Sequence, residues 1–317
     1  MDKQKSVPTR AGVLAAAERV EPYVTRTPLL PFEHDGKRLW AKADCLQQGG
    51  SFKLRGASNR LLQLNEAERR TGVVAFSSGN HAQGVAIAAA RLGVRAAIVM
   101  PADAPAVKVE ATRTAGAEIV LYDRTRESRE EIAAALAEDR GAVLVPSFDD
   151  VDIIEGQGSC GVEIGEQMGH APSQVLVCCG GGGLSAGIAL ALPDSRVVTV
   201  EPEGWDDMAR SLEAGHILPV AEPAPPTRCD ALQTKRVSPL TFGALRAAGA
   251  RGVAVSEEEV EHAMRFAFAK LRLVVEPGGA VALAAVLAGR VAVEPDTVVV
   301  LSGGNVDPTV YTDILSR

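Results

Sequence analysis

The chain alternates short runs rich in β-branched residues with alanine-rich stretches, and this alternation limits its possible folds more than any other feature. Eight runs have the length and composition of strands, at residues 38–44, 73–78, 96–100, 118–122, 142–146, 174–179, 196–201 and 297–302. Four stretches between them carry apolar residues at helical spacing, at residues 80–93, 104–116, 126–141 and 152–169. Strands that alternate with helices are typical of βαβ units, so the sequence predicts an α/β fold with a mainly parallel sheet.

The composition is that of a soluble globular protein, with 46% hydrophobic and 23% charged residues in a length of 317. A net charge of -7 and a pI near 5.4 argue against a nucleic-acid surface, which needs clustered lysine and arginine. No apolar run approaches the roughly 20 residues of a membrane helix. The start MDKQKSVPTR also lacks the apolar core of a signal peptide. We therefore predict a cytoplasmic protein with no nucleic-acid and no membrane partner.

The cysteines show no paired spacing of the kind that zinc or a redox dithiol requires. They are Cys45, Cys160, Cys178, Cys179 and Cys229. The five histidines are equally scattered, so a histidine-rich metal centre is not expected. We predict that the cysteines are buried, reduced thiols.

Strands of a parallel sheet carry their chemistry at their carboxyl ends, so the loops after the strands are the most informative. The glycine run of Gly180, Gly181, Gly182 and Gly183 lies between an apolar strand and an alanine-rich stretch. Without Cβ atoms, its N–H groups can converge at the start of a helix, which predicts a phosphate-binding loop. A tight structural turn is the alternative. A nucleotide loop fits poorly, because GxxxxGKS/T is absent and the glycine spacing does not match GxGxxG.

The stretch SFKLRGA, residues 51–57, places Lys53 in the first turn of a predicted helix, with Ser51 as the expected cap. The positive end of the helix dipole disfavours an ammonium there, which predicts a lowered pKa for Lys53. A lysine that condenses with an aldehyde must spend time as the free amine, so a lowered pKa would serve that chemistry. An ordinary solvated lysine is the alternative.

The stretch SSGNHAQG follows another predicted strand and forms a strand-to-helix turn. Its site candidates are Ser77, Ser78, Gly79, Asn80 and His81. Hydroxyls and helix N–H groups suit a carboxylate, and a capping cluster is the alternative. The last predicted strand ends in LSGGN, where the hydroxyl of Ser302 can donate to or accept from a ring nitrogen.

The segments SFKLRGA, SSGNHAQG, GGGGL and LSGGNVD, in this order and at these separations, resemble the pyridoxal-phosphate (PLP) enzymes of the serine racemase and threonine/serine dehydratase family. The likeness runs from about residue 11 to the end of the sequence. It implies the PLP-dependent fold type II, similar to the tryptophan synthase β chain, with two open, twisted, mainly parallel sheets flanked by helices. A large cofactor-binding domain would comprise residues 1–71 and 146–317, and a small mobile domain residues 72–145.

The resemblance also implies which residues hold the pyridoxal 5'-phosphate. Lys53 would carry the cofactor as an internal Schiff base, and Phe52 would support its ring. Asn80 would hydrogen-bond the phenolic oxygen, and Ser302 would meet the pyridine nitrogen. The glycine run, with Leu184, would bind the phosphate.

A substrate site and a metal site are implied as well. Residues 77–81 would bind the carboxylate of an amino acid, and Arg129 matches an arginine near the substrate site of serine racemases. A helix-surface arginine paired with an acidic neighbour is the alternative for Arg129. Glu201 and Asp207, with the carbonyl of Trp205, match a divalent-cation site suited to magnesium or calcium, and solvated loop carboxylates are the alternative.

The implied reaction is the dehydration of a 3-hydroxy amino acid, L-threonine or L-serine, to a 2-oxo acid and ammonia. Lys53 would take the Cα proton, and Ser302 would favour β-elimination because a serine does not hold the ring nitrogen protonated as an aspartate does. Ser78 stands where serine racemases carry an acid on the opposite face. A racemase with side dehydratase activity is therefore the closest alternative.

Two departures from the dehydratase pattern widen the choice of substrate. The usual HPFDD reads PSFDD at residues 146–150, and the usual ADG reads CDA at residues 229–231. Both would lie near the mouth of the active site, so an aryl-serine or 3-hydroxyaspartate is a further candidate substrate.

The proline-rich residues 222–237 are expected at the surface or as a flap over the crevice. From another class, a non-catalytic small-molecule sensor stays open, and the family suggests a homodimer.

Overall fold

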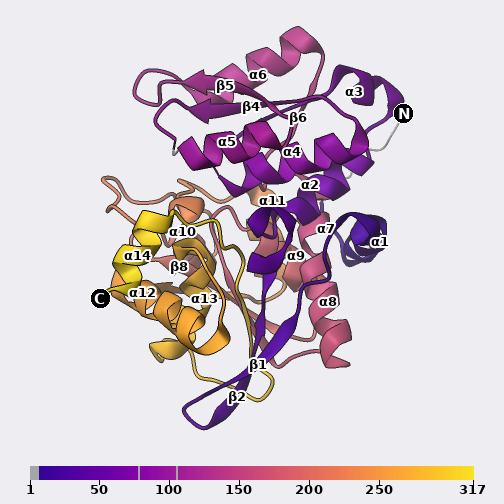
Figure 1. Ribbon diagram of the computed structural model, residues 1–317. Coiled ribbons are helices and arrows are strands. Elements are labelled where there is room, and N and C mark those ends of the chain that lie inside the picture. Colours follow the sequence, from indigo (N-terminus) through magenta and orange to yellow (C-terminus); the bar gives the residue numbers. More distant parts are fainter. Residues whose placement is uncertain (1–6, 78, 105) are drawn as a thin grey trace.

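The computed structural model describes residues 7–77, 79–104 and 106–317, and within these it contains two sheets, shown in Figure 1. The large sheet has the strand order β1-β2-β10-β7-β8-β9. In chain order its strands are β1 (Leu29–His34), β2 (Lys37–Lys42), β7 (Gln174–Cys178), β8 (Arg196–Pro202), β9 (Arg251–Val255) and β10 (Val298–Val300). Neighbouring strands are parallel except in the β1–β2 hairpin.

The small sheet is parallel throughout, with the order β5-β4-β3-β6. Its strands are β3 (Val73–Phe76), β4 (Ala96–Pro101), β5 (Glu118–Tyr122) and β6 (Val143–Leu144). All four lie within residues 72–145, the range that the resemblance assigns to the small domain. The limits of the two domains themselves stay a prediction.

Helices flank both sheets (Figure 1). In the first half of the chain they are α1 (Arg10–Val20), α2 (Lys53–Leu62), α3 (Glu66–Thr71), α4 (Asn80–Leu92), α5 (Ala106–Thr114), α6 (Arg129–Arg140) and α7 (Val151–Gln157). In the second half they are α8 (Ser159–Met168), α9 (Gly183–Ala191), α10 (Asp207–Ala214), α11 (Pro239–Ala247), α12 (Glu257–Phe266), α13 (Pro277–Leu287) and α14 (Pro308–Leu315). Within the described ranges no helix is long and apolar enough to cross a membrane.

Successive side chains of a strand alternate between the apolar clusters on the two faces of its sheet. Along β3, Val73 and Ala75 enter one apolar cluster beneath α4, whereas Val74 enters another beneath α6. This is the period of two that a strand covered on both faces requires. The large sheet has its own core of valine, alanine and leucine, in which α13 is buried along nearly its whole length.

Helix α2 lies between the two sheets (Figure 1). The resemblance places its residues in the large domain, but Leu54, Ala57 and Leu61 pack in the core of the small sheet. Arg55 instead pairs with Asp44 and Glu163, which belong to the large-sheet part of the chain. The helix that carries Lys53 is therefore held from both sides.

The eight predicted strands are all present, although β6 is only two residues long. Sequence reading missed β1 and β9, the two edge strands of the large sheet, which are short and partly exposed. The predicted helix at residues 152–169 is two helices that meet at Gly158. A Cβ there would lie 2.8 Å from the carbonyl oxygen of Gly187, so glycine permits a close crossing with α9.

Candidate active site

A cavity opens at the carboxyl ends of β7 and β10, and all of the predicted cofactor residues line it. From the predicted set these are Phe52, Lys53, Asn80, Gly180, Gly181, Gly182, Gly183, Leu184 and Ser302. The other lining residues are Ser147, Phe148, Cys178, Ala231, Leu232, Thr234, Glu276 and Gly278. Chain segments far apart in sequence thus meet where parallel sheets place their ligands.

Backbone pairing holds the start of α2 against the end of β10. Ser51 forms an antiparallel bridge with Gly303, and the N–H of Phe52 donates to the carbonyl of Ser302 at 3.0 Å. The expectation that Ser51 caps the helix is wrong. The N-cap is Phe52, without a side-chain hydrogen bond, because the backbone of Ser51 is extended and pairs with Gly303.

Lys53 is the first residue of α2, and its Nζ donates to the carbonyl of Ser147 at 3.0 Å. Burial lowers its pKa to about 8, against the opposing effects of Cys178 and Glu276. The predicted direction is thus right, but the cause differs, because loss of water around the ammonium outweighs the other contributions. A lysine in this state has a substantial fraction of free amine near neutral pH.

The glycine run connects β7 to α9 and packs tightly on the residues around it. Gly182 has φ +88°, a conformation that L side chains rarely adopt, and a Cβ on Gly181 would lie 2.1 Å from the ring of Phe148. Among the described residues no side chain caps α9, so the N–H groups of its first turn face the cavity ready for an anion. The run therefore fits a phosphate group, as the sequence predicts.

Ser302 lies just beyond β10 and beside Cys178 at the end of β7. The Sγ of Cys178 donates to the Oγ of Ser302 at 3.2 Å. Burial raises the pKa of Cys178 to about 11, which keeps the thiol protonated as a donor. A hydroxyl that accepts this hydrogen bond still has its own proton to donate, so it can donate to a neutral ring nitrogen.

Asn80 and Glu276 face each other across the cavity wall. The Nδ2 of Asn80 donates to Oε1 of Glu276 at 2.6 Å, and the Oδ1 of Asn80 accepts from Asn305 at 2.8 Å. Burial, followed by the charge of Asp230, raises the pKa of Glu276 to about 7. The cavity therefore contains an amine and a carboxyl that can both change protonation near neutral pH.

The loop of residues 77–81 leads into α4 next to the cavity, and among its described residues, 77 and 79–81, Asn80 is the one that lines the cavity. The N–H of Gly79 donates to the Oγ of Ser77 at 3.1 Å. The Nε2 of His81 contacts the carbonyl of Val145 at 2.9 Å, and burial lowers the pKa of His81 to about 3, so its ring is neutral. Ser78, the predicted acid, lies outside the described residues.

Arg129 does not line the cavity. Its guanidinium pairs with Glu130 at 2.8 Å and lies over the ring of Phe76, 5.4 Å from the centroid. The pairing with Glu130 is the alternative that the sequence left open. Phe76 directly precedes the loop of residues 77–81, so Arg129 borders that loop rather than the cavity.

The predicted metal residues lie together at the end of β8. Glu201 is buried and accepts hydrogen bonds from the N–H groups of Met208 and Ala209, while Asp207 accepts from Val237. Burial, then the charge of Asp207, raises the pKa of Glu201 well above its usual value, and burial raises the pKa of Asp207 to about 6. The Oδ1 of Asp207 is buried, and no described residue forms a hydrogen bond with it.

This arrangement fits a hard cation, because two buried carboxylates in mutual repulsion would be stabilised by a positive ion. Across the described ranges no group of three or more His, Cys, Asp and Glu side chains could hold a metal. An ion at Glu201 and Asp207 would therefore need backbone carbonyls or water to complete its ligands. Trp205 belongs to the connecting turn, where its N–H donates to the carbonyl of Pro202 at 3.0 Å.

Sequence reading missed Glu276 and Cys178. Glu276 precedes Pro277 at the start of the apolar helix α13, and a lone acid at such a start is a recognisable signal. The sequence predicts Cys178 to be a buried thiol and gives it no further role. All five cysteines are buried and free. Thr234 and Leu232 come from residues 222–237, so the predicted flap does border the cavity.

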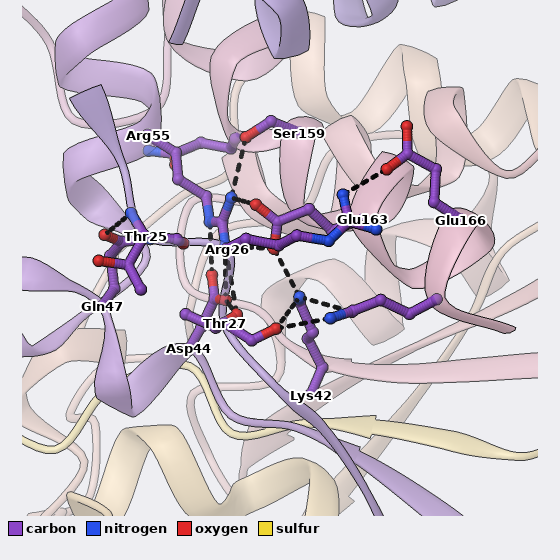
Figure 2. A network of polar contacts seen from close by, with 12 residues as sticks. Thr25, Arg26, Thr27, Lys42, Asp44, Gln47, Arg55, Ser159, Glu163 and Glu166 are labelled. Carbon is purple, nitrogen blue, oxygen red and sulfur yellow. Dashed lines mark hydrogen bonds and ion pairs between the residues drawn. The ribbon is translucent and has the colours of Figure 1, made fainter. Parts of the chain in front are cut away.

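A buried network of charges lies on the other side of α2 (Figure 2). Arg55 reaches Asp44 at 2.8 Å and Glu163 at 2.6 Å, and Lys42 reaches the other oxygen of Glu163 at 2.5 Å. Burial alone would lower the pKa of Arg55, but the charge of Asp44 and contacts with Glu163 raise it well above its usual value. The network therefore fixes the helix that presents Lys53.

Comparisons with known proteins agree with this geometry. A family model described as "Pyridoxal-phosphate dependent enzyme" matches residues 20–304. An L-threo-3-hydroxyaspartate ammonia-lyase from a Pseudomonas species is 42% identical, with 96% of this chain and 97% of that protein covered. A serine racemase from Schizosaccharomyces pombe is 38% identical, with 98% of each covered.

Solved structures give the same result. The structure of maize serine racemase superposes with a TM-score of 0.91 at 35% identity, covering 98% of each chain. The structure of a threonine deaminase from the organism abbreviated T.th. superposes with a TM-score of 0.87 at 45% identity, covering 95% of this chain and 99% of that one.

Proposed function

This chain belongs to the family of pyridoxal-phosphate dependent enzymes, with the fold type II architecture, and we propose that it is an ammonia-lyase that dehydrates a 3-hydroxy amino acid. The products would be a 2-oxo acid and ammonia. One observation carries the proposal: the amine of Lys53, the glycine run and Ser302 line a single cavity. Relatives that are ammonia-lyases for L-threo-3-hydroxyaspartate and L-threonine support the reaction class.

The residues of the cavity fit pyridoxal 5'-phosphate. Lys53 would hold it covalently, the glycine run and Leu184 would bind its phosphate, and Ser302 would meet its ring nitrogen. Phe52 and Asn80 complete the set on the wall of the cavity. When bound, the cofactor withdraws electrons from the Cα of an amino acid and so makes the Cα proton removable.

The side chains then decide the outcome. Lys53, with a pKa of about 8, would take the Cα proton at its Nζ. The oxygen of Ser302 accepts a hydrogen bond from Cys178. Its hydroxyl would therefore donate a hydrogen bond to the ring nitrogen while keeping its proton. By leaving the ring nitrogen unprotonated, Ser302 would favour loss of the β-hydroxyl. The Cα–H and Cβ–O bonds would break, the proton taken up by Lys53 would balance the departing hydroxyl as water, and a second water would hydrolyse the product to the 2-oxo acid and ammonia.

The test is a panel of 3-hydroxy amino acids, in both enantiomers, supplied to the PLP-loaded protein. L-serine, L-threonine and L-threo-3-hydroxyaspartate are the first candidates, and ammonia and 2-oxo acid are measured together. We expect equal amounts of the two products from at least one substrate and none with Lys53→Ala. If no member of the panel releases ammonia, the proposed function is wrong.

A racemase is the second candidate, and relatives named serine racemase favour it. The same panel separates the two, because a racemase forms the opposite enantiomer faster than the 2-oxo acid. Ser78 would be its opposite-face acid. A non-catalytic sensor would instead show neither product, and lack of a visible absorbance band from lysine-bound cofactor would favour it.

We also propose that Glu201 and Asp207, with the carbonyl of Trp205, bind magnesium or calcium. The unpartnered Oδ1 of Asp207 supports this. We expect millimolar magnesium to raise the melting temperature of the wild type but not of Asp207→Asn. An equal rise in both proteins would place the ion elsewhere.

We also propose that the protein is a homodimer, because the family suggests it. A cytoplasmic location is proposed because the five cysteines are unpaired thiols.

A further inference from the structure

One buried lysine outside the cofactor set lies beside the expected substrate loop. Lys108, on α5, comes so close to the loop that its Nζ lies 4.0 Å from where a Cβ on Gly79 would be. Its side chain is only 11% exposed. Lysine is seldom buried to this extent without an anion beside it, because removing the ammonium from water is costly.

The anion beside Lys108 is Asp230, which forms an ion pair with its Nζ. Asp230 belongs to residues 229–231, one of the two places where the chain departs from the dehydratase pattern, and the next residue, Ala231, lines the cavity. The side chain of Asp230 is 52% exposed. About half of this side chain thus remains in water, so the pair is open to solvent on the Asp230 side and another anion can compete for Lys108.

The charge of Lys108 also reaches the interior of the cavity. It lowers the pKa of Glu276, while Asp230 raises it, although burial is the largest influence on that group. Glu276 hydrogen-bonds Asn80, at the start of the substrate loop. Lys108 does not line the cavity itself, but it lies beside Gly79 of the expected substrate loop and pairs with Asp230, the neighbour of the lining residue Ala231.

We infer that Lys108 is a specificity residue that binds the side-chain carboxylate of an acidic 3-hydroxy amino acid. This rests on the proposed function and narrows its substrate class to hydroxylated aminodicarboxylates. The α-carboxylate is held by the loop of residues 77–81, and the second carboxylate replaces Asp230 at the Nζ of Lys108. A substrate with an uncharged side chain leaves the Lys108–Asp230 pair intact, and Lys108 then adds nothing to its binding affinity.

The experiment compares L-aspartate with L-asparagine, which have nearly the same shape but differ in charge. Neither has a β-hydroxyl, so neither undergoes the elimination. Binding to the PLP-loaded protein is measured by titration calorimetry. In the wild type we expect L-aspartate to bind more tightly, by about tenfold to a hundredfold, the effect of one charge-assisted hydrogen bond. Lys108→Met is expected to abolish this preference, and Lys108→Arg to restore most of it.

Asp230→Asn provides an independent test, because it removes the internal competitor. It is expected to tighten the binding of L-aspartate by about two- to fivefold and to leave that of L-asparagine unchanged. This variant decides the question even if Lys108→Met does not fold. Arg113→Met is the matched control, since Arg113 is on the same helix, is exposed and forms an ion pair along that helix with Glu110. It is expected to leave both affinities unchanged.

Two results would overturn the inference. Equal binding of L-aspartate and L-asparagine by the wild type would show that no carboxylate receptor exists. An equal loss of both ligands in Lys108→Met and Asp230→Asn would show that the pair only joins α5 to the segment around Asp230. Failure of the proposed function is distinguishable, because a protein without lyase activity could still show a preference for L-aspartate that depends on Lys108.

Discussion

Lys53 and Arg55 lie two residues apart on α2, yet they occupy opposite electrostatic environments. Arg55 is fully buried and surrounded by the carboxylates of Asp44 and Glu163. Lys53 faces a cavity in which its Nζ donates to a carbonyl oxygen, and described acidic side chains form no ion pair with it. One cation is neutralised by its surroundings, and the other is not.

The pKa values follow this difference. The charge of Asp44 and contacts with Glu163 raise that of Arg55, whereas burial without an adjacent counter-ion lowers that of Lys53 to about 8. Figure 2 shows how the network joins Arg55 of α2 to Asp44 and Glu163, which come from other segments of the chain. The same helix thus uses one buried charge to fix its position and another to supply a reactive amine.

The largest expected effect is on activity. Lys53→Met should lower turnover of the best 3-hydroxy amino acid by at least about a thousandfold, because it removes both the covalent anchor and the proton acceptor. In the cofactor-free protein the free energy of unfolding should not fall, since an uncompensated charge is removed. Turnover and urea denaturation measure the two quantities. Substantial turnover in the variant would show that another group does the chemistry.

Arg55→Met should affect mainly the free energy of unfolding, whereas Lys53→Met affects mainly turnover. It leaves Asp44 and Glu163 without their shared cation, and we expect the free energy of unfolding to fall by about 3–5 kcal/mol. Lys53→Met is the matched control, because the same substitution two residues away should cost nothing. A loss below about 1 kcal/mol would mean that the network contributes little to holding α2.

A pH effect of intermediate size should distinguish Lys53 from an ordinary lysine. Its amine loses its proton as pH rises through about 8 rather than 10.5, so capture of PLP by the cofactor-free protein should accelerate up to about pH 8 and then level off. Stopped-flow absorbance gives the rate, with Nα-acetyl-lysine as the reference. A rate that keeps rising beyond about pH 9.5 would contradict the lowered pKa.

The smallest expected effect concerns Cys178. Its thiol is neutral and makes one weak hydrogen bond to Ser302, so Cys178→Ala should weaken retention of PLP by no more than about threefold. Equilibrium dialysis against the cofactor measures this. A loss of a hundredfold would mean that the thiol does more than orient the hydroxyl.

Much of this architecture could be predicted from the sequence because local patterns encode it. The apolar runs locate the strands, and the glycines at 180–183 and the lysine at 53 stand where loops follow strands or begin helices. The resemblance to a known family then predicted that these residues bind PLP. The match of the family model confirmed the family. The edge strands β1 and β9 escaped because short, half-exposed segments have weak periodicity.

What could not be predicted depends on contacts between distant segments. Nothing local marks Arg55 as buried, since its partners lie 11 and 108 residues away. The lowered pKa of Lys53 was expected from the helix dipole, whereas its cause is burial, which only the packed structure reveals. Glu276 has a local signal at the start of α13, but its place in the cavity depends on its contact with Asn80, and Lys108 becomes noticeable only when Asp230 is seen beside it.

The central claim is that the amine of Lys53 carries PLP in this cavity, and chemical trapping tests it most directly. The loaded protein is reduced with borohydride, digested and mapped by mass spectrometry. We predict a single pyridoxyl-modified peptide, with the modification on Lys53. A modification on any other lysine, or no trapped cofactor at all, would contradict the account.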